Sequence, residues 1–355
     1  MATTKLLWDI GTAYDLFVSL QVVRDPAHFG VRGAWAAGVR ARLGPAERET
    51  LEQFRLAFLH VPLAWVHALP QPKDGAAILW ALGQIPPSER LSTLALDLDW
   101  PPAAAETLRN VAARGNWNEQ DRKALLPLCE HKKETERLTS EDLASILNAW
   151  AHAAESGERY LAVLRGYQAV FFAEEERRIR PALEAALARA QEQAGRLELL
   201  DLLEELSQGL RFETPIEEPE LALAPSYWCT PLMYFGRISA ERRIFLFGAR
   251  PPDASLIPGE AVPDALVRAL QALSDPTRLR ILYYLSENTL SPTELSRRLR
   301  LRTPTVLHHL NTLRLAGLVQ VTLKEGTETK TYGVRAEAVA AAFASLQGFL
   351  RKGGT

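Results

Sequence analysis

The spacing of apolar residues near the C-terminal end of the chain changes at Gly317. Within residues 303–316 apolar side chains recur every three or four positions, which is the period of one buried face of a helix. Within residues 319–323 they alternate with polar ones, which is typical of a strand with one buried face. The pattern therefore predicts a helix that ends at Gly317 and a strand that follows it.

Two further helices are predicted before this one. Asp275-Pro276 is a helix start, with an N-cap acid and a proline at the first helical position. The residues Ser291-Pro292-Thr293-Glu294 form a capping box at the start of the second helix. A turn at Glu325-Gly326 and a second strand through Tyr332 complete a β-hairpin. Three helices followed by a hairpin predict a winged helix-turn-helix.

Such a module places its third helix in the major groove of DNA and its hairpin along the backbone. With the apolar face of residues 303–316 turned inward, the polar side chains of the same helix can reach bases or phosphates. The residues predicted to contact DNA are Ser291, Thr293, Arg302, Thr303, Thr305, His308, His309, Asn311, Thr312, Arg314, Lys324 and Lys330.

Three stretches of this region resemble the ArsR-type family of bacterial repressors: residues 272–282, 305–310 and 313–319. The resemblance covers only the C-terminal part of the chain. It implies a homodimer that binds operator DNA through the third helix and the wing, and that releases the DNA when an effector arrives.

The chain departs from the family at several positions. Leu307 stands where the family usually has serine before the paired histidines, so base preference cannot be transferred. Glu325 and Glu328 reduce the positive charge of the wing tip. Many members bind metals through cysteines in the second helix or through Asp, His and Glu after the wing. Here residues 293–299 lack cysteine and residues 336–350 lack His and Asp, so neither metal site is expected.

The charge of the chain is divided unevenly. The net charge is −2, yet residues 262–355 carry 13 Lys and Arg against 7 Asp and Glu, and the remainder carries 28 against 36. A basic end on an acidic body is consistent with a protein that binds phosphate with one end only. We therefore divide the chain into a helical effector or partner domain (1–210), a proline-rich connector with a β-hairpin (211–261), and a DNA-binding and dimerisation domain (262–355).

The first domain is predicted to be multi-helical, so the fold class is mainly α. A helix from Thr12 should end before Asp25-Pro26, and the later helices predicted from the apolar pattern cover 74–84, 87–96, 101–114, 118–134 and 140–155. Residues 158–209 form either a helical hairpin that packs on these helices or a dimerising coiled coil. Breaks expected at Pro181 and Gly195 favour packing within the domain.

Residues 211–263, which include the connector, contain eight prolines. The connector segments Tyr227–Phe235 and Arg243–Phe247 are rich in aromatic and β-branched residues and predict two antiparallel strands, the first confined to a sheet edge or bulge by Pro231. The hairpin could join the body to the DNA-binding module, or it could be the last piece of the body.

The sequence offers little further chemistry. It has two cysteines, no glycine-rich phosphate loop, no nucleophile elbow and no long apolar run, so we expect a cytoplasmic protein without cofactor or metal. All eight tryptophans lie before residue 229. They could line a pocket for an apolar ligand, although filling a helical core is the commoner role of any single tryptophan.

These patterns favour a DNA-binding transcriptional regulator, most simply a repressor, that binds its operator as a homodimer. Its helical body would receive a non-metal signal, such as a small molecule or a peptide. The alternative is an enzyme or protein-interaction protein in which the winged helix serves for dimerisation or docking. A steep salt dependence of specific DNA binding would distinguish the two.

Overall fold

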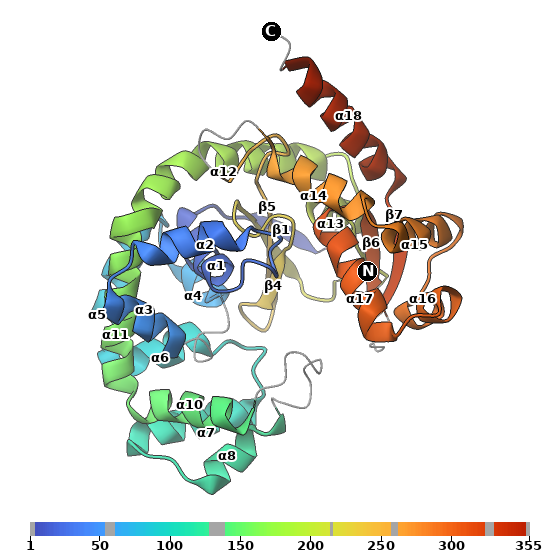
Figure 1. Cartoon of the computed structure of the whole chain (residues 1–355). Coiled ribbons are helices and arrows are strands. Elements are labelled where there is room, and N and C mark those ends of the chain that lie inside the picture. Colours follow the sequence, from blue (N-terminus) through green and yellow to red (C-terminus); the bar gives the residue numbers. More distant parts are fainter. Residues whose placement is uncertain are drawn as a thin grey trace.

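The computed structural model describes residues 4–53, 61–127, 139–213, 216–256, 262–323 and 330–352. Within them the chain is mainly α-helical and ends in a winged helix-turn-helix (Figure 1). The helices that precede this module are α1 Thr12–Arg24, α2 Gly33–Ala41, α3 Pro45–Gln53, α4 Leu63–Ala68, α5 Gly75–Gln84, α6 Pro87–Ala95, α7 Pro102–Arg114, α8 Glu119–Leu125, α10 Ser140–Ala151, α11 Ala153–Tyr167, the π-helix η1 Gln168–Phe172, α12 Ala173–Ala194 and α13 Leu199–Leu206.

Helix α1 lies at the centre of the body. Every residue from Thr12 to Val23 is buried, so this helix is covered on all sides and not on one face only. It ends at Arg24, as Asp25-Pro26 predicts. Thr12 is the first residue of the helix and Gly11 is its N-cap, and the Thr12 hydroxyl donates to Glu176 of α12.

The helices predicted at 74–84, 87–96 and 101–114 are confirmed as α5, α6 and α7. The helix predicted at 118–134 is shorter where it is described: α8 ends at Leu125, and residues 128–138 lie outside the described residues. The helix predicted at 140–155 ends at Ala151, because the backbone of His152 leaves the helical conformation before α11 begins.

The long helices α11 and α12 pack within the body. Helix α11 lies against α3 and α6, and α12 lies against strand β3 and α13. The break expected at Pro181 is absent, since α12 runs through this residue and arches over the body (Figure 1). Pro181 is exposed, so water can hydrate the carbonyl group that its missing N–H leaves without a partner.

A four-stranded sheet in the order β1-β3-β5-β4 completes the body. Its strands are β1 Lys5–Trp8, β3 Glu220–Ser226, β4 Tyr234–Arg237 and β5 Arg242–Gly248. Strands β1, β3 and β5 are parallel, and β4 pairs antiparallel with β5. The segment treated above as a connector thus shares a sheet with the N-terminal strand, which was not predicted.

The antiparallel pair predicted in the connector is present as β4 and β5, but the first strand begins later than predicted. Residues 243–247 lie within β5. Residues 227–231 form a turn, and the strand that pairs with β5 begins only at Tyr234. The turn is fixed by Asp15 of α1, because its carboxylate accepts hydrogen bonds from the Trp228 and Tyr227 N–H groups and so draws them away from a ladder.

Burial also changes the acidity of Asp15. Its Oδ1 accepts hydrogen bonds from Ser226 Oγ (2.7 Å) and the Trp228 N–H (2.8 Å), and its Oδ2 accepts one from the Tyr227 N–H (3.2 Å). Burial outweighs these donors and raises the pKa of Asp15 to about 7. The folded chain therefore binds this proton more tightly than the unfolded chain.

We expect the contribution of Asp15 to the free energy of unfolding to be full at pH 4, to fall as the pH rises from about 4 to about 7, and to be flat above that range. Asp15→Asn removes this slope, so it should lower stability most at pH 5 and by progressively less as the pH rises to 7 and 8. Urea unfolding of both proteins at pH 5, 6, 7 and 8 measures the difference. Identical slopes would show that Asp15 titrates normally.

The C-terminal module consists of α14 Asp264–Leu273, α15 Pro276–Glu287, α16 Pro292–Leu299, α17 Thr303–Leu315, β6 Val319–Leu323, β7 Lys330–Val334 and α18 Ala336–Lys352. It has its own hydrophobic core, distinct from that of the body. The Asp275 cap, the Ser291–Glu294 capping box and the helix end at Gly317 (φ 72°) are confirmed. The predicted winged helix-turn-helix is therefore present.

The body reaches the module through the segment Ser207–Phe212, which we call the docking segment. It contains strand β2 Leu210–Phe212, which pairs in parallel with β6 and extends the wing sheet to the order β2-β6-β7. The Val321 N–H donates to the Gly209 carbonyl at 2.8 Å, and the Glu213 N–H to the Leu323 carbonyl at 3.2 Å. The free edge of the wing sheet is thus covered by the body.

Candidate nucleic-acid interface

Helix α17 presents one polar face to solvent. Val306, Leu310 and Leu313 are fully buried against the module core, as their spacing predicts. Thr305, His308 and Asn311 are exposed on the opposite side, and these side chains can form hydrogen bonds to base edges. The arrangement is that of a helix able to enter a major groove.

Three predicted contact residues of α17 are only half-exposed: Thr303, His309 and Thr312. The Thr312 hydroxyl donates to the His308 carbonyl at 3.1 Å, so it is partly engaged within the helix. Burial lowers the pKa of His309, and its Nδ1 atom is buried without a hydrogen-bond partner. His309 is consequently neutral near pH 7 and offers only its outer edge to a ligand.

The two residues at the start of α16 that were predicted to contact DNA differ in their surroundings. Thr293 is exposed, whereas the Ser291 hydroxyl is held in the capping box, where it donates to Glu294 Oε2 (2.7 Å) and accepts from the Glu294 N–H. Ser291 is thereby committed to the helix start. Arg302, which precedes α17, is exposed.

Arg314 does not lie where the sequence places it. Only 9% of the residue is exposed, and its guanidinium donates to the carbonyls of Ser207 (2.8 Å) and Gln208 (3.1 Å) in the docking segment. Burial lowers its pKa to about 10, and the charge of Arg335 contributes. Arg314 is four residues after Leu310 and belongs to the buried stripe, so in this arrangement it joins module to body and does not face phosphate.

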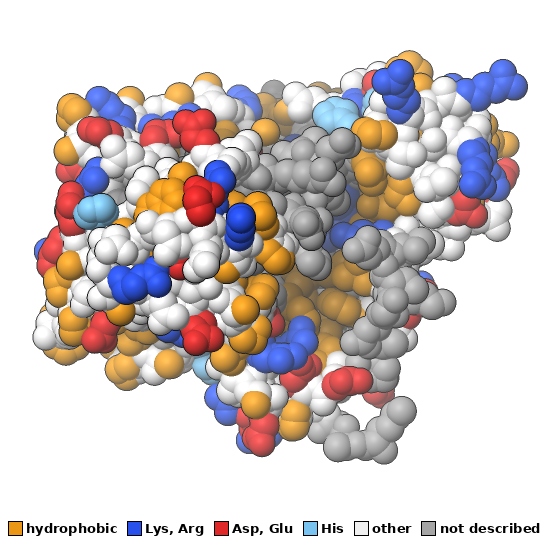
Figure 2. Space-filling model, turned by 90° about the horizontal axis from the view of Figure 1, so that it is seen from below, with side chains coloured by type: hydrophobic (Ala, Val, Ile, Leu, Met, Phe, Trp, Pro, Cys, Tyr) orange, Lys and Arg blue, Asp and Glu red, His pale blue; other side chains and the backbone are white. Residues whose placement is uncertain are grey.

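The wing is described only in part. Lys330 begins β7 and is exposed, whereas Lys324, Glu325 and Glu328 lie outside the described residues. The sequence reasoning overlooked a neighbouring basic run: Arg297, Arg298 and Arg300 are exposed at the end of α16. This run leads directly to Arg302, and its density of arginine is a signal for phosphate contact. Figure 2 shows Lys and Arg side chains along the outer edge of the lobe that carries these helices.

Docking on the body leaves the polar face of α17 free. The docking segment contacts Arg314 near the C-terminal end of the helix and the edge of β6, while Thr305, His308 and Asn311 remain exposed. Arg335, just before α18, also donates to the carbonyls of Gln208 (3.1 Å) and Gly317 (3.2 Å). The body is thus attached to the module without covering its candidate reading surface.

Several large apolar side chains of the module are exposed. They are Leu279 (48%) and Tyr283 (63%) of α15, and Phe343 (53%) and Leu350 (66%) of α18. Helix α18 extends away from the rest of the chain (Figure 1). Such positions are unusual on the surface of an isolated domain and suggest a covering partner.

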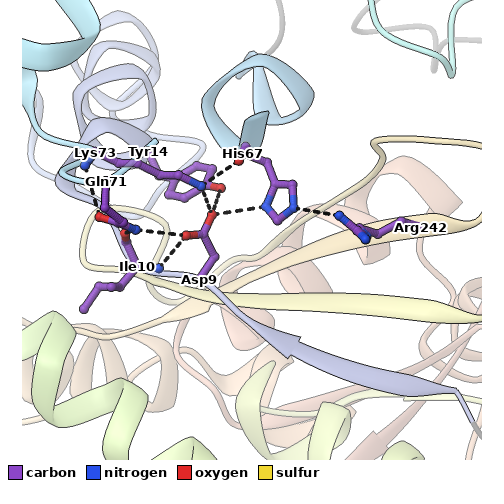
Figure 3. A network of polar contacts seen from close by, with 7 residues as sticks. All are labelled: Asp9, Ile10, Tyr14, His67, Gln71, Lys73 and Arg242. Atoms are coloured by element: carbon purple, nitrogen blue, oxygen red, sulfur yellow. Dashed lines mark hydrogen bonds and ion pairs between the residues drawn. The ribbon is translucent and has the colours of Figure 1, made fainter. Parts of the chain in front are cut away.

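The body contains a polar cluster around Asp9, at the carboxyl end of β1 (Figure 3). Its carboxylate accepts from the Ile10 N–H, Tyr14 Oη, Gln71 Nε2 and Lys73 Nζ, and contacts His67 Nδ1 at 3.1 Å. These hydrogen bonds lower the pKa of Asp9 although burial opposes them. The carboxylate is fully occupied and secures residues 67–73 to β1.

The aromatic residues near the sheet mainly fill the core. Trp150 and Trp228 are fully buried, and Trp228 stacks on Trp35 with ring centroids 4.7 Å apart. Cys229 is buried, and burial raises the pKa of its thiol. One surface pocket of about 300 Å³ is lined by residues of α3, α10 and α11, and none of its lining residues is a tryptophan.

Two general properties of the described residues bear on function. They contain no group of three or more His, Cys, Asp or Glu side chains placed to hold a metal ion. None of their helices combines the length and the apolarity needed to cross a bilayer.

Residues 275–321 match the family described as bacterial regulatory protein, arsR family. Among solved structures, reduced HlyU from Vibrio cholerae N16961 is 34% identical over 22% of this chain and 83% of its own, with a TM-score of 0.20. Another structure of HlyU from the same organism is 37% identical over 22% of this chain and 86% of its own, also with a TM-score of 0.20. No curated protein matches the chain.

Proposed function

Because the chain belongs, through its C-terminal module, to the arsR family of bacterial regulatory proteins and is a DNA-binding transcriptional regulator, we propose that it acts as a homodimeric repressor that responds to a non-metal signal received by its body. The observation that carries the proposal is the combination of a free polar face on α17 with direct attachment of the same helix to the body.

The exposed apolar side chains of α18 and α15 support a dimer. A two-fold partner would bury Phe343 and Leu350, which the described part of one chain leaves in water. A dimer of this kind would place two copies of α17 about 34 Å apart, one turn of the double helix. The exposed arginines around residues 297–302 would then lie beside the phosphates that flank each half-site.

The docking segment supports a route for the signal. An effector can act only if it binds the DNA-competent and the released conformations with different affinity. Hydrogen bonds from Arg314 and Arg335 to the docking segment mean that a movement of the body also moves the end of α17 and the wing sheet. The turn at Tyr227 and Trp228 lies in the body core and holds α1 to the sheet.

Selection from a random duplex library with the full chain tests the DNA-binding part of the proposal. We expect one enriched, two-fold symmetric sequence whose affinity falls steeply with salt. No enrichment, together with binding that is insensitive to salt, would favour the alternative in which the winged helix only docks proteins.

The selected operator then tests the signal. We expect zinc, cadmium and arsenite to leave the complex intact and an organic or peptide-like ligand of the body to release it. The isolated module, residues 253–355, which has its own hydrophobic core, should still bind the operator but no longer respond to that ligand. Release by micromolar metal, or a full response from the isolated module, would contradict the proposed input.

A further inference from the structure

Arg250 is a buried cation that is only partly satisfied. It follows β5, and 6% of the residue is exposed. Its N–H and Nη2 groups donate to Thr230 Oγ1 (3.2 Å) and to the Thr230 carbonyl (2.5 Å). Its Nη1 group is buried and has no hydrogen-bond partner. A buried guanidinium N–H without an acceptor is costly, so the site lacks one acceptor.

A second arginine with the same deficit, half-buried as a whole, lies on α14. The Nε and Nη1 groups of Arg268 are both buried without a hydrogen-bond partner. The side chain packs against Gly30, where an added Cβ would lie 3.0 Å from Arg268 Cδ. Gly30 also has a φ of 64°, so two independent reasons keep this position open for the arginine.

Arg250 and Arg178 both contact the Tyr227 ring, and the charge of Arg250 acts on Arg268. Arg250 Cζ lies 5.7 Å from the centre of the Tyr227 ring, and Arg178 Cζ lies 4.8 Å from the same ring. Burial lowers the pKa of Arg268 to about 10, and repulsion from the Arg250 charge contributes. Burial and mutual repulsion of these cations lower the stability of the folded chain.

The acidic residues nearby do not supply the missing acceptors. Asp264 attracts both arginines, but its Oδ2 accepts the Leu256 N–H and its Oδ1 lies 4.0 Å from Arg32. Glu175 is paired with Arg178. The unmatched groups on Arg250 and Arg268 are all donors and both side chains are cationic, so their complement is an oxygen anion with more than one acceptor.

We propose that Arg250 and Arg268 bind an oxyanion, the carboxylate or phosphate group of a small effector. Arg250 belongs to the body, whereas Arg268 belongs to α14, which packs on α15, α17 and α18 of the module. An anion held by both arginines would tie the body to the module and favour one relative arrangement of the two. The consequence for DNA rests on the proposed function, but binding of the anion does not.

Thermal unfolding of the full chain in inorganic phosphate or in acetate, at ionic strength held constant with sodium chloride, tests the site. The wild type should gain thermal stability in at least one of the two anions, and the more effective anion identifies the chemistry of the effector. Arg268→Met should weaken binding of that anion about tenfold or more. Arg196→Gln, on an exposed arginine of the body, is the control for general effects of the salts and should respond as the wild type does.

A second readout separates a binding site from a structural arginine. Without either anion, Arg268→Met should melt at or above the temperature of the wild type, because it replaces a cation whose Nε and Nη1 groups are buried and unpaired with an apolar chain of similar length. Equal responses of wild type and Arg268→Met to both anions would overturn the proposal. A lower melting temperature of the variant without anion would also overturn it.

Operator affinity of the same proteins, measured without anion, keeps the two proposals apart. Arg268→Met should bind operator as the wild type does, because Arg268 is not on the reading face. Failure of every protein to select an operator would remove the proposed function and leave the anion site standing. If the proteins select an operator but show no response to either anion, the proposed function stands and the anion site is overturned.

Discussion

The double variant Phe343→Glu, Leu350→Glu should convert the protein from a dimer to a monomer and weaken operator binding about 100- to 10,000-fold, because each half-site would then be bound without the help of the other. Both side chains are more than half exposed in one chain, so two glutamates there cost the monomer little stability. Across a two-fold interface they would place buried like charges together. Sedimentation equilibrium and operator titration measure the two effects.

A matched control uses the same helix. Ala341→Glu, Ser345→Glu adds the same charge at exposed positions on the opposite side of the helix from Phe343 and Leu350, and this protein should remain a dimer with wild-type affinity. If the Phe343 and Leu350 variant stays a tight dimer, α18 is not the interface. The exposed Leu279 and Tyr283 of α15 would then be the next positions to test.

Arg314→Ala should loosen the body from the module while leaving the salt dependence of DNA binding unchanged. The variant leaves the Ser207 carbonyl without its charged donor and the Gln208 carbonyl with Arg335 alone, which costs about 1.5–3 kcal/mol for a hydrogen bond of this kind. Limited proteolysis should therefore cut near residue 213 faster than in the wild type. The slope of log affinity against log salt should not change, since the guanidinium is turned away from solvent.

Arg302→Ala provides the contrast. Arg302 is exposed immediately before α17, and loss of one phosphate contact should reduce the salt slope by about 0.9.

Gly209→Ala is a second way to disturb the docking segment without touching a charge, because φ is 100° there and an added Cβ would lie 2.7 Å from Arg335 Cδ. A reduced salt slope in Arg314→Ala would show that this residue leaves the body and meets phosphate when DNA binds.

The sequence predicted the DNA-binding module well because its signals are local. The Asp275 cap, the Ser291–Glu294 capping box and the stop at Gly317 each depend on residues within one helical turn. The buried stripe through Val306 and Leu310 is equally local. Each of these signals agrees with the others, which is why the order of elements was recovered.

Prediction from the sequence failed where the partner of a residue lies far away in the chain. Strand β1 has four residues, and its partner β3 follows more than 200 residues later, so no local pattern announced the pairing. Arg314 looked like a surface cation because the carbonyls that satisfy it are 106 and 107 residues upstream. The spacing of Arg314, four residues after Leu310, was the available signal that this side chain is buried. The prediction of a phosphate contact rested on its charge instead.

The central claim is that the exposed face of α17 reads DNA sequence. The most direct measurement is the affinity of the wild type, Thr305→Ala and Asn311→Ala for the selected operator and for random duplex at several salt concentrations. We predict that each variant loses about 1–3 kcal/mol on the operator, keeps the affinity of the wild type for random duplex, and has an unchanged salt slope. Equal losses on both DNAs, or no loss on either, would contradict the claim.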